Sequence, residues 1–135
     1  MTAAPANTTL LHDVHVLIVD DHEDALEVFD AALRHCGAKV LKARNAADAL
    51  TIIKSARVDA IVSDLAMPGN DGLWLVQQIR RLPRRGGGSI PAVAVTAYSS
   101  HYDTTRIAEG GFEIVLTKPV DPFQLSSTIA FLVGR

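Results

Sequence analysis

The chain has 135 residues, 48% of them hydrophobic, and carries a formal net charge of −2. This composition provides enough apolar side chains for one compact domain, and the slightly acidic balance gives no support for a nucleic-acid-binding surface. No apolar run approaches the roughly 20 residues that a membrane-spanning helix needs, and residues 1–12 lack the pattern of a signal peptide. We therefore predict a single cytoplasmic domain with neither nucleic-acid nor membrane partners.

Two kinds of segment alternate along the chain after a loose leader at residues 1–13. Short continuous apolar runs are typical of strands that are covered on both faces, and apolar residues at helical spacing indicate helices between them. The predicted strands lie near 16–19, 39–43, 60–64, 92–96 and 114–117, and the predicted helices near 24–36, 46–53, 73–79, 100–109 and 122–132. This alternation predicts an α/β domain over residues 14–135, a doubly wound five-stranded parallel sheet with helices on both faces.

Some residues of types that often act in catalysis or binding are interpreted here as structural. Cys36 is the only cysteine, and a lone thiol is more often buried than reactive. The glycines at 86–88 precede a predicted strand rather than a helix, so they lack the context of a phosphate-binding loop. The histidines show no metal-site spacing. The one basic cluster is interpreted as a solvated helix end. It consists of Arg80, Arg81, Arg84 and Arg85.

Polar side chains follow or end four of the predicted strands: Asp20 and Asp21, Asp64, Thr96, and Lys118. Because the carboxyl ends of parallel strands meet at one edge of the sheet, these side chains can converge in one crevice. Three crowded carboxylates resist joint ionisation unless a cation lies between them. An all-oxygen cluster of this kind suits Mg²⁺, which keeps water or phosphate oxygens as its other ligands.

A phosphoryl group would complete this set of residues. Asp64 would be the nucleophile, the metal would neutralise two phosphoryl oxygens, and the Lys118 ammonium and Thr96 hydroxyl would hold the third. The product would be an aspartyl phosphate.

Four motifs occur in order along the chain: Val-Asp-Asp at 19–21, Asp-Leu-Ala-Met-Pro-Gly-Asn-Asp-Gly at 64–72, Val-Thr-Ala at 95–97 and Leu-Thr-Lys-Pro at 116–119. In type and placement they resemble the receiver domain of two-component response regulators, from Val14 to Val133. The resemblance implies the flavodoxin-like strand order 2-1-3-4-5.

The resemblance also assigns roles to the residues of the crevice. It implies that Asp64 is the phosphoacceptor and that Asp20 and Asp21 bind Mg²⁺, with Asp21 binding directly and Asp20 partly through water. The backbone carbonyl of Ala66 would be the third protein ligand of the metal, beside Asp64 itself.

Two further implied roles concern the response of the domain to phosphorylation. Thr96 would move toward the phosphoryl group, and Lys118 would pair with it. The Lys118–Pro119 peptide bond is expected to be cis.

The implied partners are a sensor histidine kinase or a histidine phosphotransfer protein as donor, and a downstream protein as target. The transfer would be catalysed largely by the receiver itself. The resemblance leaves open whether the domain acts alone as a response regulator or as the relay module of a hybrid kinase.

The sequence departs from the family pattern at Val115, where the family usually has an aromatic residue whose rotation relays the switch. The two positions that usually orient the attacking water are Ala66 and Tyr98. Because neither holds a water well, we expect the phosphoryl group to hydrolyse slowly.

Three alternative functions fit the sequence less well. A phosphohydrolase with an aspartyl nucleophile would need a second acid where Ala66 stands. A flavodoxin-like nucleotide or flavin binder would need a Gly- or Ser/Thr-rich loop after the first strand, where the chain instead has acidic residues. A receiver that serves only as a binding module would have lost some of the five site residues, and none is lost.

Overall fold

The computed structural model describes residues 9–97 and 103–135. Within these residues the chain forms five strands, five α-helices and one short 3₁₀ turn, η1. In chain order they are β1 (His15–Val19), α1 (Glu23–His35), β2 (Lys39–Ala43), α2 (Ala46–Ser55), β3 (Ala60–Asp64), α3 (Gly72–Arg80), η1 (Arg84–Gly86), β4 (Ala92–Thr96), α4 (Thr104–Gly110), β5 (Ile114–Thr117) and α5 (Pro122–Leu132). The predicted helix start near residue 100 lies outside the described residues.

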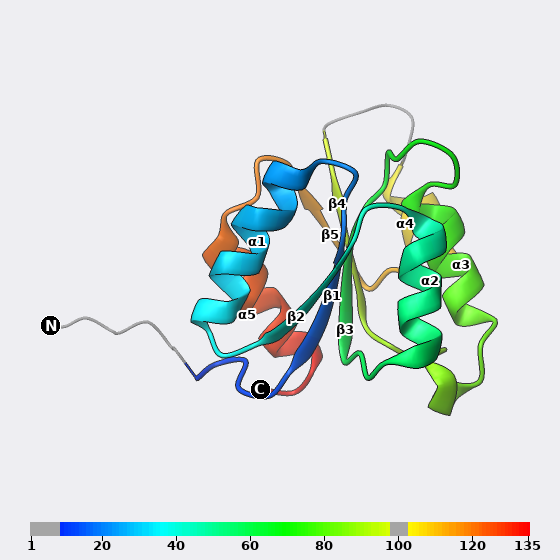
Figure 1. Ribbon diagram of the computed structural model, residues 1–135. Coiled ribbons are helices and arrows are strands. Elements are labelled where there is room, and N and C mark those ends of the chain that lie inside the picture. Colours follow the sequence, from blue (N-terminus) through cyan, green and yellow to red (C-terminus); the bar gives the residue numbers. More distant parts are fainter. Residues whose placement is uncertain (1–8, 98–102) are drawn as a thin grey trace, which may run out of the picture.

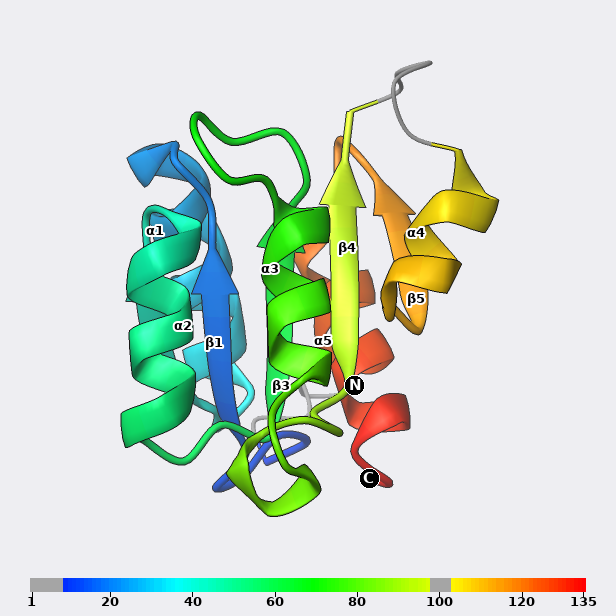
Figure 2. The same ribbon diagram turned by 90° about the vertical axis from the view of Figure 1, so that its right-hand side faces the viewer.

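The strands form one sheet in the order β2-β1-β3-β4-β5, and every neighbouring pair is parallel. Helices α1 and α5 cover one face, whereas α2, α3 and α4 cover the other (Figures 1 and 2). Both the doubly wound architecture and the strand order are therefore confirmed. None of the described helices is long and apolar enough to cross a bilayer.

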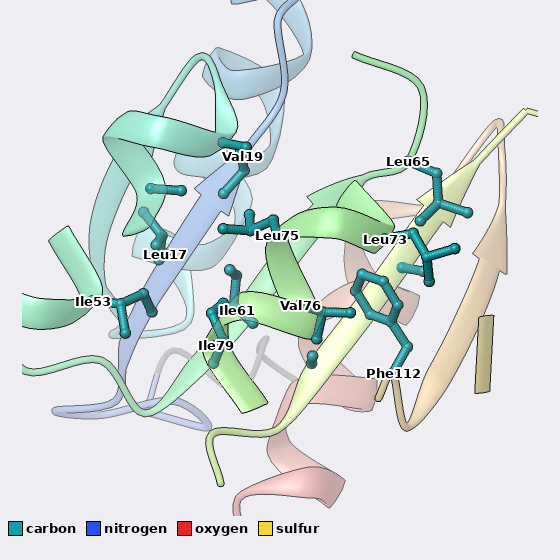
Figure 3. Close-up of a cluster of buried hydrophobic side chains, with 14 of the residues drawn as sticks. Leu17, Val19, Ile53, Ile61, Leu65, Leu73, Leu75, Val76, Ile79 and Phe112 are labelled. Carbon is teal, nitrogen blue, oxygen red and sulfur yellow. The ribbon is translucent and has the colours of Figure 1, made fainter. Parts of the chain in front are cut away.

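Two hydrophobic clusters, one on each face of the sheet, hold the layers together. Successive strand residues point to opposite faces, so Leu17 joins one cluster and Val16 the other. All residues of β3 are buried, which explains why its sequence is a continuous apolar run up to the polar pair at its end. Figure 3 shows Leu17 and Ile61 of the sheet beside Leu75 and Ile79 of α3.

The end of the segment predicted to be a loose leader is part of the fold, which corrects the expectation that ordered structure begins near Val14. Leu11 is 0% exposed and belongs to the cluster under α1 and α5. Its N–H donates to the carbonyl of Cys36 (2.8 Å), whose thiol is buried as predicted. A pair of leucines in a polar segment has no periodicity, so the sequence pattern could not show this contact.

Arg80 also differs from its interpretation as part of a solvated helix end. Its guanidinium donates to the carbonyls of Gly111 (2.8 Å) and Gly88 (3.2 Å) and to the carboxylate of Glu113 (2.8 Å). These bonds join the end of α3 to the turns before β4 and β5. The other three arginines of the cluster are exposed, as expected.

Gly72, the first residue of α3, lies unusually close to the end of β3. Its N–H donates to the carbonyl of Leu65 (2.9 Å), and a Cβ at this position would collide with the backbone oxygen of Asp64. The helix can therefore begin directly behind Asp64 only because residue 72 has no side chain.

We predict that Gly72→Ala destabilises the protein by about 1 to 3 kcal/mol, because the backbone must move to admit the methyl group. Urea denaturation would measure the loss. Gly86→Ala is the matched control, since its Cβ would make only an ordinary contact 3.5 Å from Pro83. Equal losses in the two variants would contradict the assigned role of Gly72.

Candidate functional site

The carboxyl ends of the strands bring the predicted site residues to one edge of the sheet. Asp64 is the last residue of β3, and Asp20 directly follows β1. These two side chains are nearly inaccessible, because Asp64 is 5% and Asp20 3% exposed. Asp21, which follows Asp20, is partly buried. Ligand atoms of all three acids lie within 4.8 Å of one another, in a group that also includes His22.

Lys118 is the cation of this site. Its Nζ lies 3.4 Å from Asp64 Oδ2 and 3.7 Å from Asp20 Oδ2. The backbone places it there, because the N–H of Lys118 donates to the carbonyl of Thr96 (2.8 Å) and so continues the pairing of β4 with β5. The Lys118–Pro119 bond is cis, as predicted.

Thr96 lies at the same edge but does not reach the acids in this structure. Its hydroxyl donates to the carbonyl of Ala97 (3.1 Å). Val115, at the position where the family has an aromatic residue, is partly buried against the core cluster that contains Phe112. Tyr98, the other residue predicted to influence phosphoryl lifetime, lies outside the described residues.

His22 is the residue that sequence reasoning missed. Its backbone N–H donates to Asp20 Oδ1 (2.9 Å), and its Nδ1 lies 3.2 Å from one carboxylate oxygen of both Asp20 and Asp21. The histidines show no metal-site spacing along the sequence, and spacing alone did not indicate that His22 would lie beside the acid pair. The available signal was its position directly after the acid pair, where the chain turns into α1.

The environment of Asp64 opposes its ionisation. Burial raises the pKa of this carboxyl above its ordinary value, and the neighbouring Asp20 raises it further. The Lys118 ammonium and the backbone N–H of Ala66 act in the opposite direction and lower the pKa, but they do not offset burial. The site therefore holds a carboxylate at an energetic cost that an additional cation would reduce.

The donor set fits a hard divalent cation. In the part of the chain that the structure describes, Asp21 Oδ1 is buried without a hydrogen bond, although His22 Nδ1 lies 3.2 Å from it. A buried carboxylate oxygen that accepts no hydrogen bond, next to two more carboxylates, suits Mg²⁺. Asp20, Asp21 and Asp64 could hold such an ion. The role of the Ala66 carbonyl stays a prediction.

Comparison with known proteins agrees with this geometry. Residues 16–130 match the family model described as response regulator receiver domain. An uncharacterised 14.6 kDa protein of Leptolyngbya boryana is 39% identical over 115 residues, which are 85% of this chain and 86% of that protein. The sensor histidine kinase RcsC of Salmonella typhi is 33% identical over 91% of this chain, which spans 13% of that kinase.

A solved structure supports the same assignment. The receiver domain of a sensor histidine kinase from Pseudomonas aeruginosa, with a magnesium ion coordinated in its active-site cleft, is 26% identical. It superimposes with a TM-score of 0.81 over 91% of this chain and 99% of that domain. Because the family match covers most of the chain and the sheet carries its acids and its lysine at the expected strand ends, this protein belongs to the response regulator receiver domain family.

Proposed function

We propose that this protein is a phosphorylatable receiver, which accepts a phosphoryl group on Asp64 from a phosphohistidine of a sensor histidine kinase or histidine phosphotransfer protein. One observation carries the proposal: the buried Asp64 carboxylate ends the central strand within 3.4 Å of Lys118 and in a cluster with Asp20 and Asp21. We assign this activity to the cytoplasm, where a kinase would present its phosphohistidine.

The residues divide the chemistry between them. A carboxylate oxygen of Asp64 forms the new P–O bond as the P–N bond of the donor breaks, and the histidine retains the electron pair of that bond. When bound to the three acids, Mg²⁺ would supply positive charge to the phosphoryl oxygens. Lys118 already lies between Asp64 and Asp20, so a small movement would let its ammonium pair with a phosphoryl oxygen. Thr96 would bind that group by leaving the Ala97 carbonyl.

An apolar groove next to the site supports a protein donor. The groove has a volume of about 530 Å³ and lies between α1 and the segment that follows β5. Val28, 54% exposed, lines it together with Lys118 and Pro119. Because the groove includes a residue of the acidic site, a donor helix that packs there would bring its histidine close to Asp64. Phosphorylation would then change which downstream protein the receiver binds.

The proposal predicts that the intact protein, incubated with Mg²⁺ and acetyl phosphate, gains one labile phosphoryl adduct by mass spectrometry. Asp64→Asn removes the nucleophile and should abolish the adduct, and Asp21→Ala should abolish it by removing a metal ligand. Asp59→Asn is the control, because Asp59 lies before the opposite end of β3. An adduct that persists on the Asp64→Asn protein would contradict the assignment.

A second prediction follows from the raised pKa of Asp64. When the pKa of a carboxyl group is higher in the folded than in the unfolded protein, ionisation of that group lowers the free energy of unfolding. The reduction is complete at a pH above the folded pKa, and it disappears as the pH falls below the unfolded pKa. In EDTA at pH 7, Asp64→Asn should therefore increase the free energy of unfolding. The gain should shrink in acid, and Mg²⁺ should stabilise the parent more than the variant.

The control for this comparison is Glu109→Gln, which removes one exposed carboxylate from α4. Urea denaturation across pH would measure all three proteins. If Asp64→Asn were no more stable than Glu109→Gln at pH 7, burial of the Asp64 charge would not be costly.

A third prediction concerns phosphoryl lifetime. Ala66 is exposed two residues after Asp64, and its methyl group cannot orient an attacking water. Ala66→Asn should speed loss of the phosphoryl group about tenfold, whereas Ala66→Val should not speed it. The decay of the adduct would be timed by mass spectrometry. Equal decay of the Asn variant and the parent would show that residue 66 does not control lifetime.

A further inference from the structure

A second concave surface lies at the opposite end of the sheet from the acidic site. The end of α2, the residues that follow it and the turn η1 enclose a groove of about 470 Å³. In Figures 1 and 2 this part of the molecule lies at the lower end, away from the carboxyl ends of the strands. The proposed phosphoryl transfer makes no use of this groove.

The base of the groove is apolar and closely packed. Ile53 and Val58 are buried and Ile90 is partly buried, and all three line the groove. Gly87 has a φ of +111°, and a Cβ there would lie 2.8 Å from Ile53 Cγ2 and 3.3 Å from Ile90 Cδ1. A residue with a side chain would therefore be strained and would push against this base.

The rim of the groove is cationic. Lys54, Arg57, Arg84 and Arg85 line it, and no carboxylate among the described residues does. Among residues 9–97 and 103–135, the side chains of Lys54, Arg84 and Arg85 form no ion pair and no hydrogen bond. Arg57, in contrast, pairs with Asp59 (3.2 Å). Three uncompensated positive charges thus border one groove on a chain whose net charge is −2.

The apolar base and the cationic rim together indicate what kind of ligand the groove could bind. A groove of this volume falls within the range of about 300 to 1,000 Å³ that small-molecule sites occupy, and an apolar base with a few convergent polar groups is their usual construction. Guanidinium groups match pairs of phosphate oxygens with two parallel hydrogen bonds. Because the described lining has no aromatic side chain on which bases could stack, an extended single-stranded nucleic acid fits less well.

We propose that this groove binds a small phosphorylated molecule with at least two negative charges, held by Arg84, Arg85 and Lys54 over the base formed by Ile53 and Ile90. The site is separate from Asp64 and does not depend on phosphorylation.

Isothermal titration calorimetry of the full chain with pyrophosphate and with ADP tests the proposal. EDTA is present so that no divalent ion brings phosphate to the acidic site. We expect at least one probe to bind, and the double variant Arg84→Gln/Arg85→Gln to weaken its binding about tenfold or more. Arg81→Gln is the matched control, since Arg81 is exposed in the same basic cluster but does not line the groove. It should change affinity less than about twofold.

Three results of the titrations would overturn the proposal, and a fourth would come from locating the bound probe. The first three are no binding of either probe at about 1 mM, an equal loss in the Arg81→Gln control, or binding of a pentaglutamate peptide as tight as that of the phosphorylated probes. Amide chemical shifts would locate the bound probe, and shifts at Lys118 instead of Gly86 and Gly87 would also refute it. The double variant should still accept phosphate from acetyl phosphate, which distinguishes loss of this groove from loss of the fold.

Discussion

The burial of one carboxylate among like charges is the constraint on which the rest of the site depends. Asp64 ends a strand that is buried along its whole length, so its charge is held where water is scarce and where Asp20 is close. Lys118 reduces the cost from 3.4 Å away, and a bound cation would reduce it further. The glycine at the start of α3 allows a helix to begin directly behind this strand end. The same burial that raises the pKa of Asp64 therefore makes its ionised form costly to the fold.

The acidic site and the groove beside η1 differ in the charge of the residues that line them, a difference that the net charge of −2 does not show. The carboxyl ends of the strands hold three acids and one lysine, whereas the groove beside η1 is bordered by arginine and lysine, with no acid in the part of its lining that the structure describes. A parallel sheet places the carboxyl ends of all its strands at one edge, so the acids gather there, whereas the basic residues come from the end of α2, the residues that follow it and η1. The proposed ligand groove and the proposed phosphorylation site therefore share no residue.

Much of the fold could be predicted because its local signals agree. Strands buried on both faces are continuous apolar runs, and helices packed on one face repeat at helical spacing, so their order alone indicates a doubly wound sheet. The strand order required the family resemblance, since periodicity shows that a strand is buried but not which strand lies beside it. The contacts of Leu11 and Arg80 were not predicted, because each depends on a partner distant in the sequence, at Cys36 and Gly111.

The sequence by itself determined which residues stand at the strand ends: Asp20, Asp21, Asp64, Thr96 and Lys118. It could do so because the change from apolar run to polar residue is local. Only the tertiary structure decided that His22 contacts the acid pair, that burial raises the pKa of Asp64, and that residues near 54 and 84 border one groove. Those properties depend on distances and desolvation, which arise only when segments remote in the chain are packed together.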